Sequence, residues 1–257
     1  LFGGGAGGID PASSARADTG EQLPRGLLLA GRYEIIESLG RGGLGQVYRV
    51  VDRELDEEVA LKVLHPRIAS DRRTIDRFRN ELKISRKISH KNVCRVFHFG
   101  KEGAVRYITM EYVPGESLMS LIERIGKLPE EKAIAIAMQV CEGLAEAHAI
   151  GVVHRDVKPH NIMIDRMGNV RIMDFGIARS IDTEGQTETG MVVGTPDYMS
   201  PEQVDGKEAD RRSDIYSLGI ALYEMVTGEI PFHGENTIDA ALRHKTSDMN
   251  TLIAVGT

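Results

Sequence analysis

Apolar positions in the first part of the chain follow the two-residue period of strands. Val, Ile and Tyr recur in short runs separated by turn residues, which is typical of half-buried strands. The pattern predicts five strands, over Tyr33–Leu39, Gln46–Val51, Glu58–Leu64, Cys94–Phe99 and Val105–Met110.

One helix is predicted between the third and fourth of these strands. Asp71 is a suitable N-cap, because its side chain accepts hydrogen bonds from the free N–H groups that begin a helix. The apolar residues after it recur at helical spacing and predict one buried stripe, made of Ile75, Phe78, Leu82 and Ile88.

After Pro114 and Gly115 the apolar spacing becomes helical. Pro129 is favourable at the start of a helix. We expect the buried face of this helix to consist of Ile134, Ala137, Met138, Cys141, Leu144, Ala145 and His148. The other expected elements are short strands and loops over residues 152–200 and helices over about 211–227 and Asn236–Lys245.

Residues 1–29 differ from the rest of the chain. They are rich in Gly, Ala and Ser and show no periodicity, which indicates a flexible linker with order beginning near Arg32. Residues 30–257 then form one α+β domain with two lobes. We place a small β-rich lobe with one helix at about 30–112, and a mainly helical lobe at about 113–257.

Composition narrows the classes of protein. The 257 residues are 41% hydrophobic and 27% charged, an ordinary globular balance that excludes wholesale disorder. The net charge of −6 gives no basic footprint for nucleic acid. Two cysteines argue against a disulfide framework or a cysteine zinc site, and no apolar run reaches membrane-spanning length. The chain does not begin with Met, so we expect a fragment of a longer protein.

A glycine-rich segment, residues 40–47, reads GRGGLGQV and lies between two predicted strands. Glycine lets a backbone approach a phosphate group closely. Dinucleotide-binding proteins use a similar motif, but there a helix follows the glycines. Here a strand is predicted next, which favours a hairpin, although by itself this motif is as consistent with a plain turn.

Two charged residues on neighbouring elements indicate a possible function only when they are considered as a pair. Lys62 stands in the third predicted strand and Glu81 on the predicted helix. Taken singly, each is an ordinary exposed residue. An ion pair between them behind the glycine hairpin would leave Lys62 able to bind phosphate oxygens.

Polar residues are concentrated in two later segments. Residues 154–161 read HRDVKPHN, and Asp174 follows a predicted strand in the triplet Asp-Phe-Gly. Asn161 lies 5 residues after Asp156, and Asp174 lies 13 residues after Asn161. An amide and a carboxylate on adjacent hairpin strands can converge on a hard cation, which takes oxygen ligands.

Two further segments complete the pattern. Residues 194–202 read GTPDYMSPE, and Asp214 begins an apolar helix in the segment SDIYSLG. Each motif is weak by itself. The ordered set resembles the eukaryotic-type protein kinase superfamily, in particular its bacterial Hanks-type serine/threonine branch, over about Arg32 to Lys245.

The resemblance implies a protein kinase fold and transfer of the ATP γ-phosphate to Ser or Thr hydroxyls of proteins. Asp156 would orient the substrate hydroxyl, and Lys158 would steady the γ-phosphate. Asn161 and Asp174 would bind Mg²⁺, with Mn²⁺ as the alternative ion. Lys62 would hold the α- and β-phosphates and pair with Glu81. The glycine hairpin would cover the phosphates with Gly40, Arg41, Gly42, Gly43 and Gly45.

The same resemblance implies an adenine pocket. Met110 would guard its back, and Glu111 and Val113 would offer backbone groups to the adenine edge. Val47, Ala60 and Met163 would cover the two faces of the ring, in addition to packing as ordinary core residues.

The resemblance also implies specificity and regulation. Lys158 and Thr195 match the serine/threonine pattern rather than the tyrosine one. His160 stands where many relatives have a glutamate that reads basic substrates, so we expect no strong preference for basic sequences. Activation-loop autophosphorylation is expected on Thr187 and Thr189, with Thr183 as a further candidate.

Two departures from the family pattern stand out. Ser85 occupies a position that is usually apolar and stacks on Phe175, and we expect this polar residue to loosen the alignment of the helix. The terminal helices of the family, with an arginine that pairs with Glu202, are missing from the sequence. We expect an unpaired buried carboxylate there to cost about 3–5 kcal/mol.

Partners and location follow from the family alone. Expected partners are ATP, proteins with Ser or Thr acceptors, and a second copy of the chain for autophosphorylation in trans, but no nucleic acid. The domain would be cytoplasmic within a membrane-anchored full-length protein.

Three other functions share some of these motifs. A pseudokinase, or an inactive ATP-binding scaffold, is the main one, although all five residues of the catalytic set are present: Lys62, Glu81, Asp156, Asn161 and Asp174. A small-molecule kinase is less consistent with the segment 194–202. A Rossmann oxidoreductase lacks the helix after the glycines.

Overall fold

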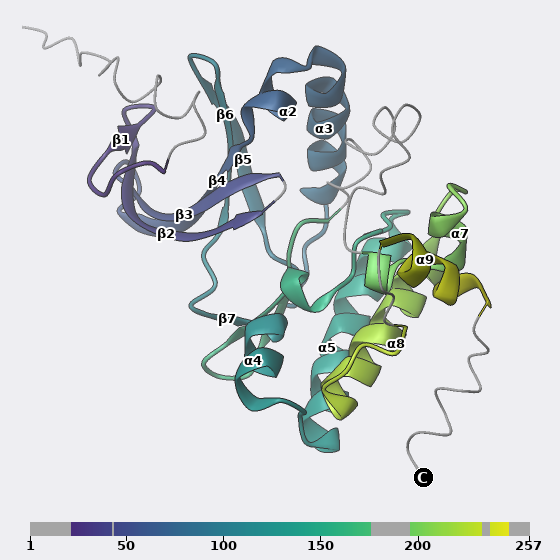
Figure 1. The fold of residues 1–257 in the computed structure, drawn as a ribbon. Coiled ribbons are helices and arrows are strands. Elements are labelled where there is room, and N and C mark those ends of the chain that lie inside the picture. The colour runs from purple at the N-terminus through teal and green to yellow at the C-terminus, as the bar shows by residue number, and fades with distance from the viewer. Residues whose placement is uncertain (1–21, 43, 176–195, 233–236, 247–257) are drawn as a thin grey trace, which may run out of the picture. The chain divides into compact units, whose positions relative to one another are not determined.

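The computed structural model describes residues 22–42, 44–175, 196–232 and 237–246. The chain divides into two compact units, one formed by residues 1–82 and 95–112 and the other by residues 83–94 and 113–257. The first is built mainly from strands and the second mainly from helices, so the predicted α+β class is confirmed (Figure 1). The segment 83–94, which the sequence grouped with the β-rich lobe, belongs to the second unit.

The first unit contains one antiparallel six-stranded sheet with the strand order β1-β2-β3-β4-β6-β5. The strands are β1 (Leu28–Leu29), β2 (Tyr33–Gly42), β3 (Gly45–Asp52), β4 (Glu57–Leu64), β5 (Val96–Glu102) and β6 (Val105–Glu111). All five predicted strands are present. Their inward residues form a core that includes Ile35, Tyr48, Val50 and Leu61.

Helix α3 (Arg72–Ser85) follows the short helix α2 (Pro66–Ser70), which the sequence did not predict. The Asp71 carboxylate accepts hydrogen bonds from the backbone N–H groups of Arg73 and Thr74, as expected for an N-cap. The predicted stripe is buried, including Phe78 at its centre. The helical pattern therefore indicated both the start and the buried side of α3.

Residues 22–29 of the predicted linker are part of the folded first unit. Leu23 and Leu29 are buried in the core of the first unit, and Leu28 and Leu29 pair with β2. The Tyr48 hydroxyl accepts a hydrogen bond from the Leu23 N–H at 2.9 Å. The sequence missed this segment because its leucines form a consecutive run without strand or helix periodicity. Residues 1–21 of the predicted linker lie outside the described residues.

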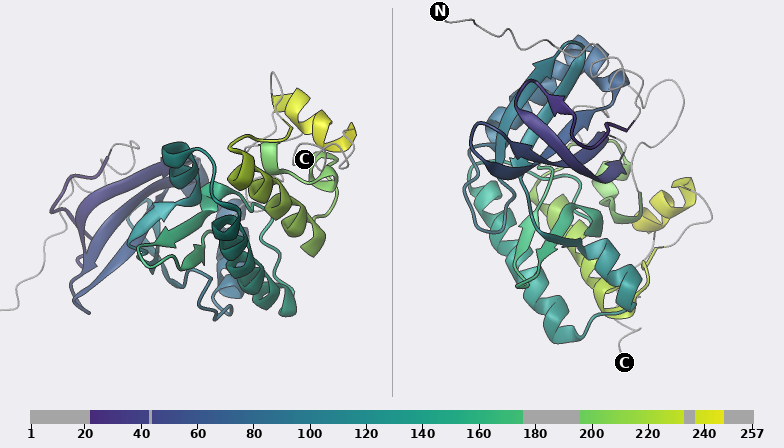
Figure 2. Two further views of the ribbon diagram at one scale, coloured as in Figure 1. Left: turned by 90° about the horizontal axis from the view of Figure 1, so that it is seen from below. Right: turned by 90° about the vertical axis from the view of Figure 1, so that its left-hand side faces the viewer.

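The second unit places a small sheet beside a set of helices (Figures 1 and 2). Strands β7 (Gly115–Ser117), β8 (Ile162–Asp165) and β9 (Val170–Ile172) pair in that order and are antiparallel. The helices are α4 (Leu118–Ile125), α5 (Glu130–Ala149), α7 (Pro201–Val204), α8 (Arg211–Thr227) and α9 (Thr237–Thr246), with 3₁₀ turns at Pro159–Asn161 and Pro196–Tyr198.

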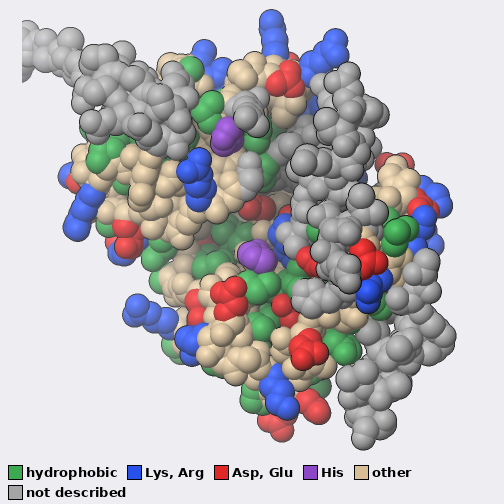
Figure 3. Space-filling model, viewed as in Figure 1, with side chains coloured by type: hydrophobic (Ala, Val, Ile, Leu, Met, Phe, Trp, Pro, Cys, Tyr) green, Lys and Arg blue, Asp and Glu red, His purple; other side chains and the backbone are tan. Residues whose placement is uncertain are grey.

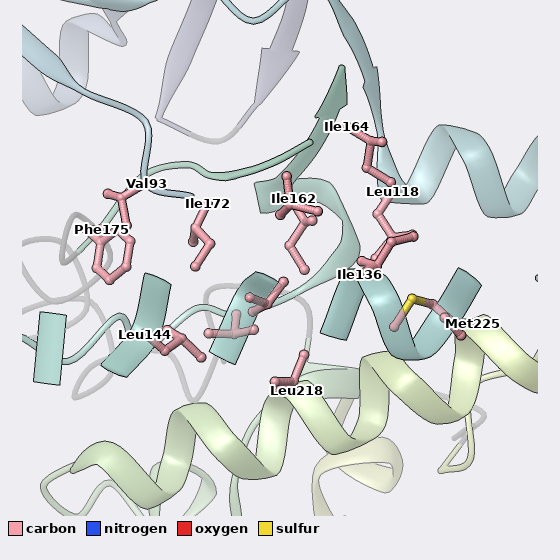
Figure 4. Packing of buried hydrophobic residues seen from close by; sticks show 14 of the residues in the cluster. Val93, Leu118, Ile136, Leu144, Ile162, Ile164, Ile172, Phe175, Leu218 and Met225 are labelled. Atoms are coloured by element: carbon pink, nitrogen blue, oxygen red, sulfur yellow. The ribbon is translucent and has the colours of Figure 1, made fainter. Parts of the chain in front are cut away.

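Helices α5 and α8 lie side by side and hold the main core of this unit. Figure 4 shows Leu218 and Met225 of α8 pointing toward α5, where they meet a cluster that includes Ile136 and Leu144. Ile172 of β9 belongs to the same cluster. This packing fixes β8 and β9 against α5, and with them the polar residues at the strand ends.

The predicted buried face of α5 was wrong for most of its residues. Ile134 and Met138 are 52% and 61% exposed, and Cys141 is exposed as well. Apolar residues surround most of this helix, so periodicity alone did not choose a face. The buried face is instead the one on which Gly143 lies, because close packing against β9 requires a small residue there. An added Cβ at Gly143 would lie 2.8 Å from the Ile172 side chain. The residues that are buried are Ala133, Ile136, Val140, Gly143, Leu144 and Ala147.

Charged side chains of both signs lie on the surface of the described residues. On the face drawn in Figure 3, Lys and Arg side chains are interspersed with Asp and Glu side chains. In the part of the chain that the structure describes, no helix is long and apolar enough to cross a membrane.

Candidate active site

The glycine-rich segment forms a hairpin between β2 and β3, as predicted. Gly42 of β2 pairs with Gly45 of β3, and strand pairing continues without an intervening helix. Gly45 has a φ of +150°, and an added Cβ would lie 1.9 Å from the Val63 carbonyl oxygen, so β4 requires glycine here. At Gly40 and Gly42 an added Cβ would meet no atom of the described residues within 4 Å. Packing within the protein therefore does not explain these two glycines.

Lys62 is placed in β4, opposite Val47 of β3 and Ile108 of β6. It is only 6% exposed, which is unusual for a lysine and contradicts the ordinary reading of a solvated strand residue. Glu81 lies on α3 and is half-buried. The Lys62–Glu81 ion pair stays a prediction.

Three of the predicted adenine-contacting residues lie on one part of the sheet. Ala60 of β4 pairs directly with Met110 at the end of β6, and both are buried. Val47 of β3 is partly exposed. Glu111 closes β6, where its N–H donates to the Arg95 carbonyl at 2.9 Å. The assignment of these residues to adenine stays a prediction.

The catalytic-loop residues lie close together in the second unit. The Lys158 ammonium is 2.9 Å from the Asp156 carboxylate. The Asn161 amide nitrogen donates to the Asp156 carboxylate at 2.9 Å and to its backbone carbonyl at 2.8 Å. The Asp156 carboxylate therefore contacts both the positively charged ammonium of Lys158 and the amide N–H donor of Asn161. The remaining carbonyl oxygen of the Asn161 side chain is the atom with which it can bind a cation.

Asn161 and Asp174 stand at the same end of the β8–β9 hairpin. Asn161 directly precedes β8, and Asp174 follows β9 by two residues. The Met173 N–H donates to the Asn161 backbone carbonyl at 2.8 Å, which ties the two segments together. Asp174 has a φ of +59°, a left-handed conformation that Asp tolerates better than most residues. The strand pairing thus brings the predicted metal-binding residues to one hairpin end.

Phe175 packs against two residues that the sequence associated with it. Its ring centroid is 4.6 Å from that of His154. The Ser85 hydroxyl donates to the Phe175 carbonyl at 3.0 Å, and Ser85 is buried. The polar side chain at this position therefore makes a hydrogen bond to the segment it faces, and the expected loosening of the helix stays a prediction.

Asp214 holds the backbone of the catalytic loop. Its carboxylate is fully buried and accepts hydrogen bonds from the N–H groups of His154 at 2.8 Å and Arg155 at 2.7 Å. His148 of α5 contacts the same carboxylate at 2.7 Å. The sequence indicates Asp214 as part of a motif but gives no sign of this role, and helical spacing predicts His148 on an apolar helix face.

Another buried contact joins the segment before α7 to α8. The Tyr198 hydroxyl donates to the Glu224 carboxylate at 2.6 Å, and both residues are nearly inaccessible to solvent. Burial and the neighbouring carboxylate raise the pKa of Tyr198 far above its usual range. No signal in the sequence pointed to Glu224, because a single acidic residue in a helix is usually exposed.

Glu202 is not an unpaired buried carboxylate, contrary to expectation. It is half-buried and accepts a hydrogen bond from the Ser213 hydroxyl. Burial alone would raise the pKa of Glu202, but hydrogen bonds from Ser213 and Ser200 hold it below its ordinary value. The penalty expected for this carboxylate therefore does not apply.

Several predicted residues lie outside the described residues. They are Gly43, Gly176, the threonines Thr183, Thr187 and Thr189, and Gly194 with Thr195. Among the residues that are described, no group of three or more His, Cys, Asp and Glu side chains forms a metal cluster. The predicted pair of Asn161 and Asp174 falls outside this definition, because it has two members and asparagine is not one of the four residue types.

Comparison with known proteins identifies the family of the chain. A family model of the protein kinase domain matches residues 33–255. The chain belongs to the protein kinase domain family. It is 43% identical over 219 residues to the serine/threonine-protein kinase PrkC of Bacillus subtilis, a match covering 85% of this chain and 34% of PrkC. It is 42% identical over 224 residues to the serine/threonine-protein kinase PknA of Mycobacterium tuberculosis, covering 85% of this chain and 52% of PknA.

Solved structures agree with this membership. The crystal structure of a mutant form of the PknI kinase domain of Mycobacterium tuberculosis matches with a TM-score of 0.69 and 28% identity, covering 82% of this chain and 80% of that one. The predicted protein kinase fold and the resemblance to bacterial serine/threonine kinases are therefore confirmed. The chain spans about a third of PrkC and about half of PknA.

One position of the kinase loop has an unusual electrostatic setting. Partial burial and the nearby Lys158 ammonium lower the pKa of His160, against the opposing charges of Glu123 and Asp156. The expectation of no strong preference for basic substrates stays a prediction.

Proposed function

We propose that this domain is an ATP-dependent protein kinase that phosphorylates Ser and Thr hydroxyls of proteins. The observation that carries the proposal is the Asp156 carboxylate held between Lys158 and Asn161. A carboxylate in this setting can accept a hydrogen bond from a substrate hydroxyl. The ammonium group beside it can offset negative charge on a transferred phosphoryl group.

The nucleotide phosphates are assigned to the glycine hairpin and to Lys62. Open space around the Cβ positions of Gly40 and Gly42 is what close backbone approach to a phosphate requires. The ATP assignment also includes Gly43, Gly45 and Arg41 in the hairpin, Val47, Ala60, Met110, Glu111, Val113 and Met163 around adenine, and Glu81 as the partner of Lys62.

Asn161 and Asp174 would hold the divalent cation. They offer an amide oxygen and a carboxylate at one hairpin end, which suits a hard cation such as Mg²⁺, with Mn²⁺ as the alternative. The bound cation would neutralise phosphate charge during transfer. In our proposal this chain contributes the oxygen ligands and keeps Asp156 beside Lys158.

The decisive experiment is phosphate transfer by the 257-residue chain. We would incubate it with radiolabelled ATP, Mg²⁺ and a mixture of Ser-, Thr- and Tyr-containing peptides, and identify the phosphorylated amino acids. We expect label on Ser and Thr. The matched control is Asp156→Asn, which keeps the size of the side chain and should lower transfer at least about a hundredfold. Bound ATP without transfer in the unchanged chain would instead favour the pseudokinase alternative.

Autophosphorylation on Thr187 and Thr189, in trans within a homodimer, is part of the proposal. It rests on the family resemblance, as does a cytoplasmic location within a membrane-anchored protein. Phosphopeptide mapping after incubation with MgATP tests the two sites. Finding label on neither threonine in an active preparation would contradict this part of the proposal.

A further inference from the structure

Gln203 connects helix α7 to the loop that carries Asp156. Its amide nitrogen donates to the Arg155 carbonyl at 2.7 Å, across 48 residues of sequence. At the other end of the amide, its oxygen accepts from the Ser200 N–H and hydroxyl, both at 3.1 Å. Each end of this side chain therefore has a different partner.

The Arg155 carbonyl belongs to the peptide bond that immediately precedes Asp156. The N–H of that same peptide, contributed by Asp156, donates to the His154 ring nitrogen at 3.2 Å. Gln203 and His154 thus hold opposite edges of one peptide plane. Since the Asp156 Cα is attached to this plane, its orientation helps determine where the carboxylate points.

Arg155 adopts a backbone conformation that needs such support. Its φ is +67°, in the left-handed region that residues other than glycine rarely adopt. Its N–H donates to Asp214 at 2.7 Å, and its carbonyl accepts from Gln203. Hydrogen bonds therefore restrain both the N–H and the carbonyl of Arg155, and Gln203 donates the hydrogen bond to the carbonyl.

We propose that Gln203 is a positioning residue for Asp156, acting through the Arg155 carbonyl. Because Gln203 belongs to α7, the position of Asp156 also depends on the position of this helix. The inference rests on the proposed function for its effect on catalysis, but the hydrogen bond that it invokes can be tested without any activity.

The variant Gln203→Glu separates the two hydrogen bonds. A carboxylate at the third helical position still accepts from the N-cap residue, so this variant retains the contact with Ser200. It removes the donor to Arg155 and places an oxygen against that carbonyl. Ser200→Ala is the matched control, because it removes the hydroxyl contact and leaves the Gln203 amide able to donate to Arg155.

The first measurement is hydrogen–deuterium exchange of the amides in residues 153–158 of the whole chain. We expect exchange to be at least about fivefold faster in Gln203→Glu than in the unchanged chain or in Ser200→Ala. Unchanged protection of the Asp156 amide would overturn the inference, whether or not the protein transfers phosphate.

The second measurement is the rate of phosphate transfer as a function of MgATP concentration. We expect Gln203→Glu to lower kcat about tenfold while KM for ATP stays within about twofold, because misorientation of Asp156 affects transfer rather than nucleotide binding.

A thermal midpoint close to that of the unchanged chain shows that the variant folds. Equal kcat in the two proteins would overturn the positioning role. An unchanged chain without activity would contradict the proposed function and leave the exchange result to decide the inference.

Discussion

Individual residues at this site are held by partners that stand far away in the sequence. Asp214 shows how this works, because one buried carboxylate accepts the N–H groups of His154 and Arg155 and contacts His148. A buried charge costs much free energy unless it is paired and hydrogen-bonded. Once these contacts form, the same charge fixes the conformation of the loop that precedes Asp156.

The Tyr198–Glu224 hydrogen bond allows a prediction at the same scale. Tyr198→Phe removes the hydroxyl that donates to a carboxylate buried in α8, while the ring is retained. We expect the free energy of unfolding to fall by about 1–3 kcal/mol, measured by urea denaturation. Glu224→Gln keeps an acceptor for the hydroxyl and should cost less. Equal stability of Tyr198→Phe and the unchanged chain would show that this contact contributes nothing.

At the scale of elements, close backbone approach decides which side chains are tolerated. The strand β3 passes so near β4 that Gly45 has no room for a Cβ, and α5 turns Gly143 toward β9 for the same reason. Small residues thus set the distance between neighbouring elements. The polar residues at the ends of those elements are placed as a consequence.

Two glycines of the same hairpin are predicted to respond differently to alanine. Gly45→Ala would place its Cβ against the Val63 carbonyl, so we expect the free energy of unfolding to fall by about 1–3 kcal/mol. Gly42→Ala enters open space and should change stability by less than about 0.5 kcal/mol. Thermal or urea unfolding of the two variants makes the comparison. Similar losses in both would mean that the close contact at Gly45 is relieved at little cost.

The contact of α9 with α8 should depend on pH through His244. This residue is buried against the rings of Tyr216 and Phe232, and its Nδ1 is 2.8 Å from the Tyr216 hydroxyl. Burial lowers the pKa of His244 below 6.5, although Asp197 opposes the shift. The unfolded chain then binds the proton more tightly than the folded one. Stability is therefore expected to fall as the pH drops below about 6.5, and to level off below the folded pKa.

Replacement of this histidine provides the measurement. In His244→Asn the part of the pH dependence that comes from this group is absent. We expect the difference in unfolding free energy between the two proteins to change by up to about 1.4 kcal/mol per pH unit between about pH 6.5 and the folded pKa. A difference that is constant over this range would contradict the assignment.

At the scale of the whole molecule, the proposed function includes the binding of ATP and a divalent cation to the folded chain. A ligand that binds the folded chain and not the unfolded one raises the stability of the fold that it contacts. The proposed function therefore has a consequence for stability that is independent of catalysis.

Magnesium and ATP together are predicted to stabilise the chain. At a concentration about 100 times Kd the gain is about 2.7 kcal/mol, which a thermal-shift measurement detects as a higher Tm. Asp156→Asn should keep most of the shift, because that residue is assigned to the substrate hydroxyl. Asp174→Asn should lose most of it, because it removes a carboxylate ligand of the cation. An equal shift in all three proteins would contradict the metal assignment.

The sequence alone predicted most of the longer elements and a candidate chemistry for the site. The five strands, helix α3 and the helices α8 and α9 follow from periodicity and capping, because these are local properties of the chain. The types and spacing of Lys62, Asp156, Asn161 and Asp174 likewise indicated phosphate and cation chemistry.

Only the tertiary structure decided which face and which partner each residue has. The buried side of α5 depends on where β9 comes close to Gly143, and the ordering of Leu23 depends on a hydroxyl 25 residues away. The links from Asp214 and Gln203 to the catalytic loop join segments about 50 to 60 residues apart. Periodicity describes neighbours along the chain, whereas these contacts form only when the chain has folded.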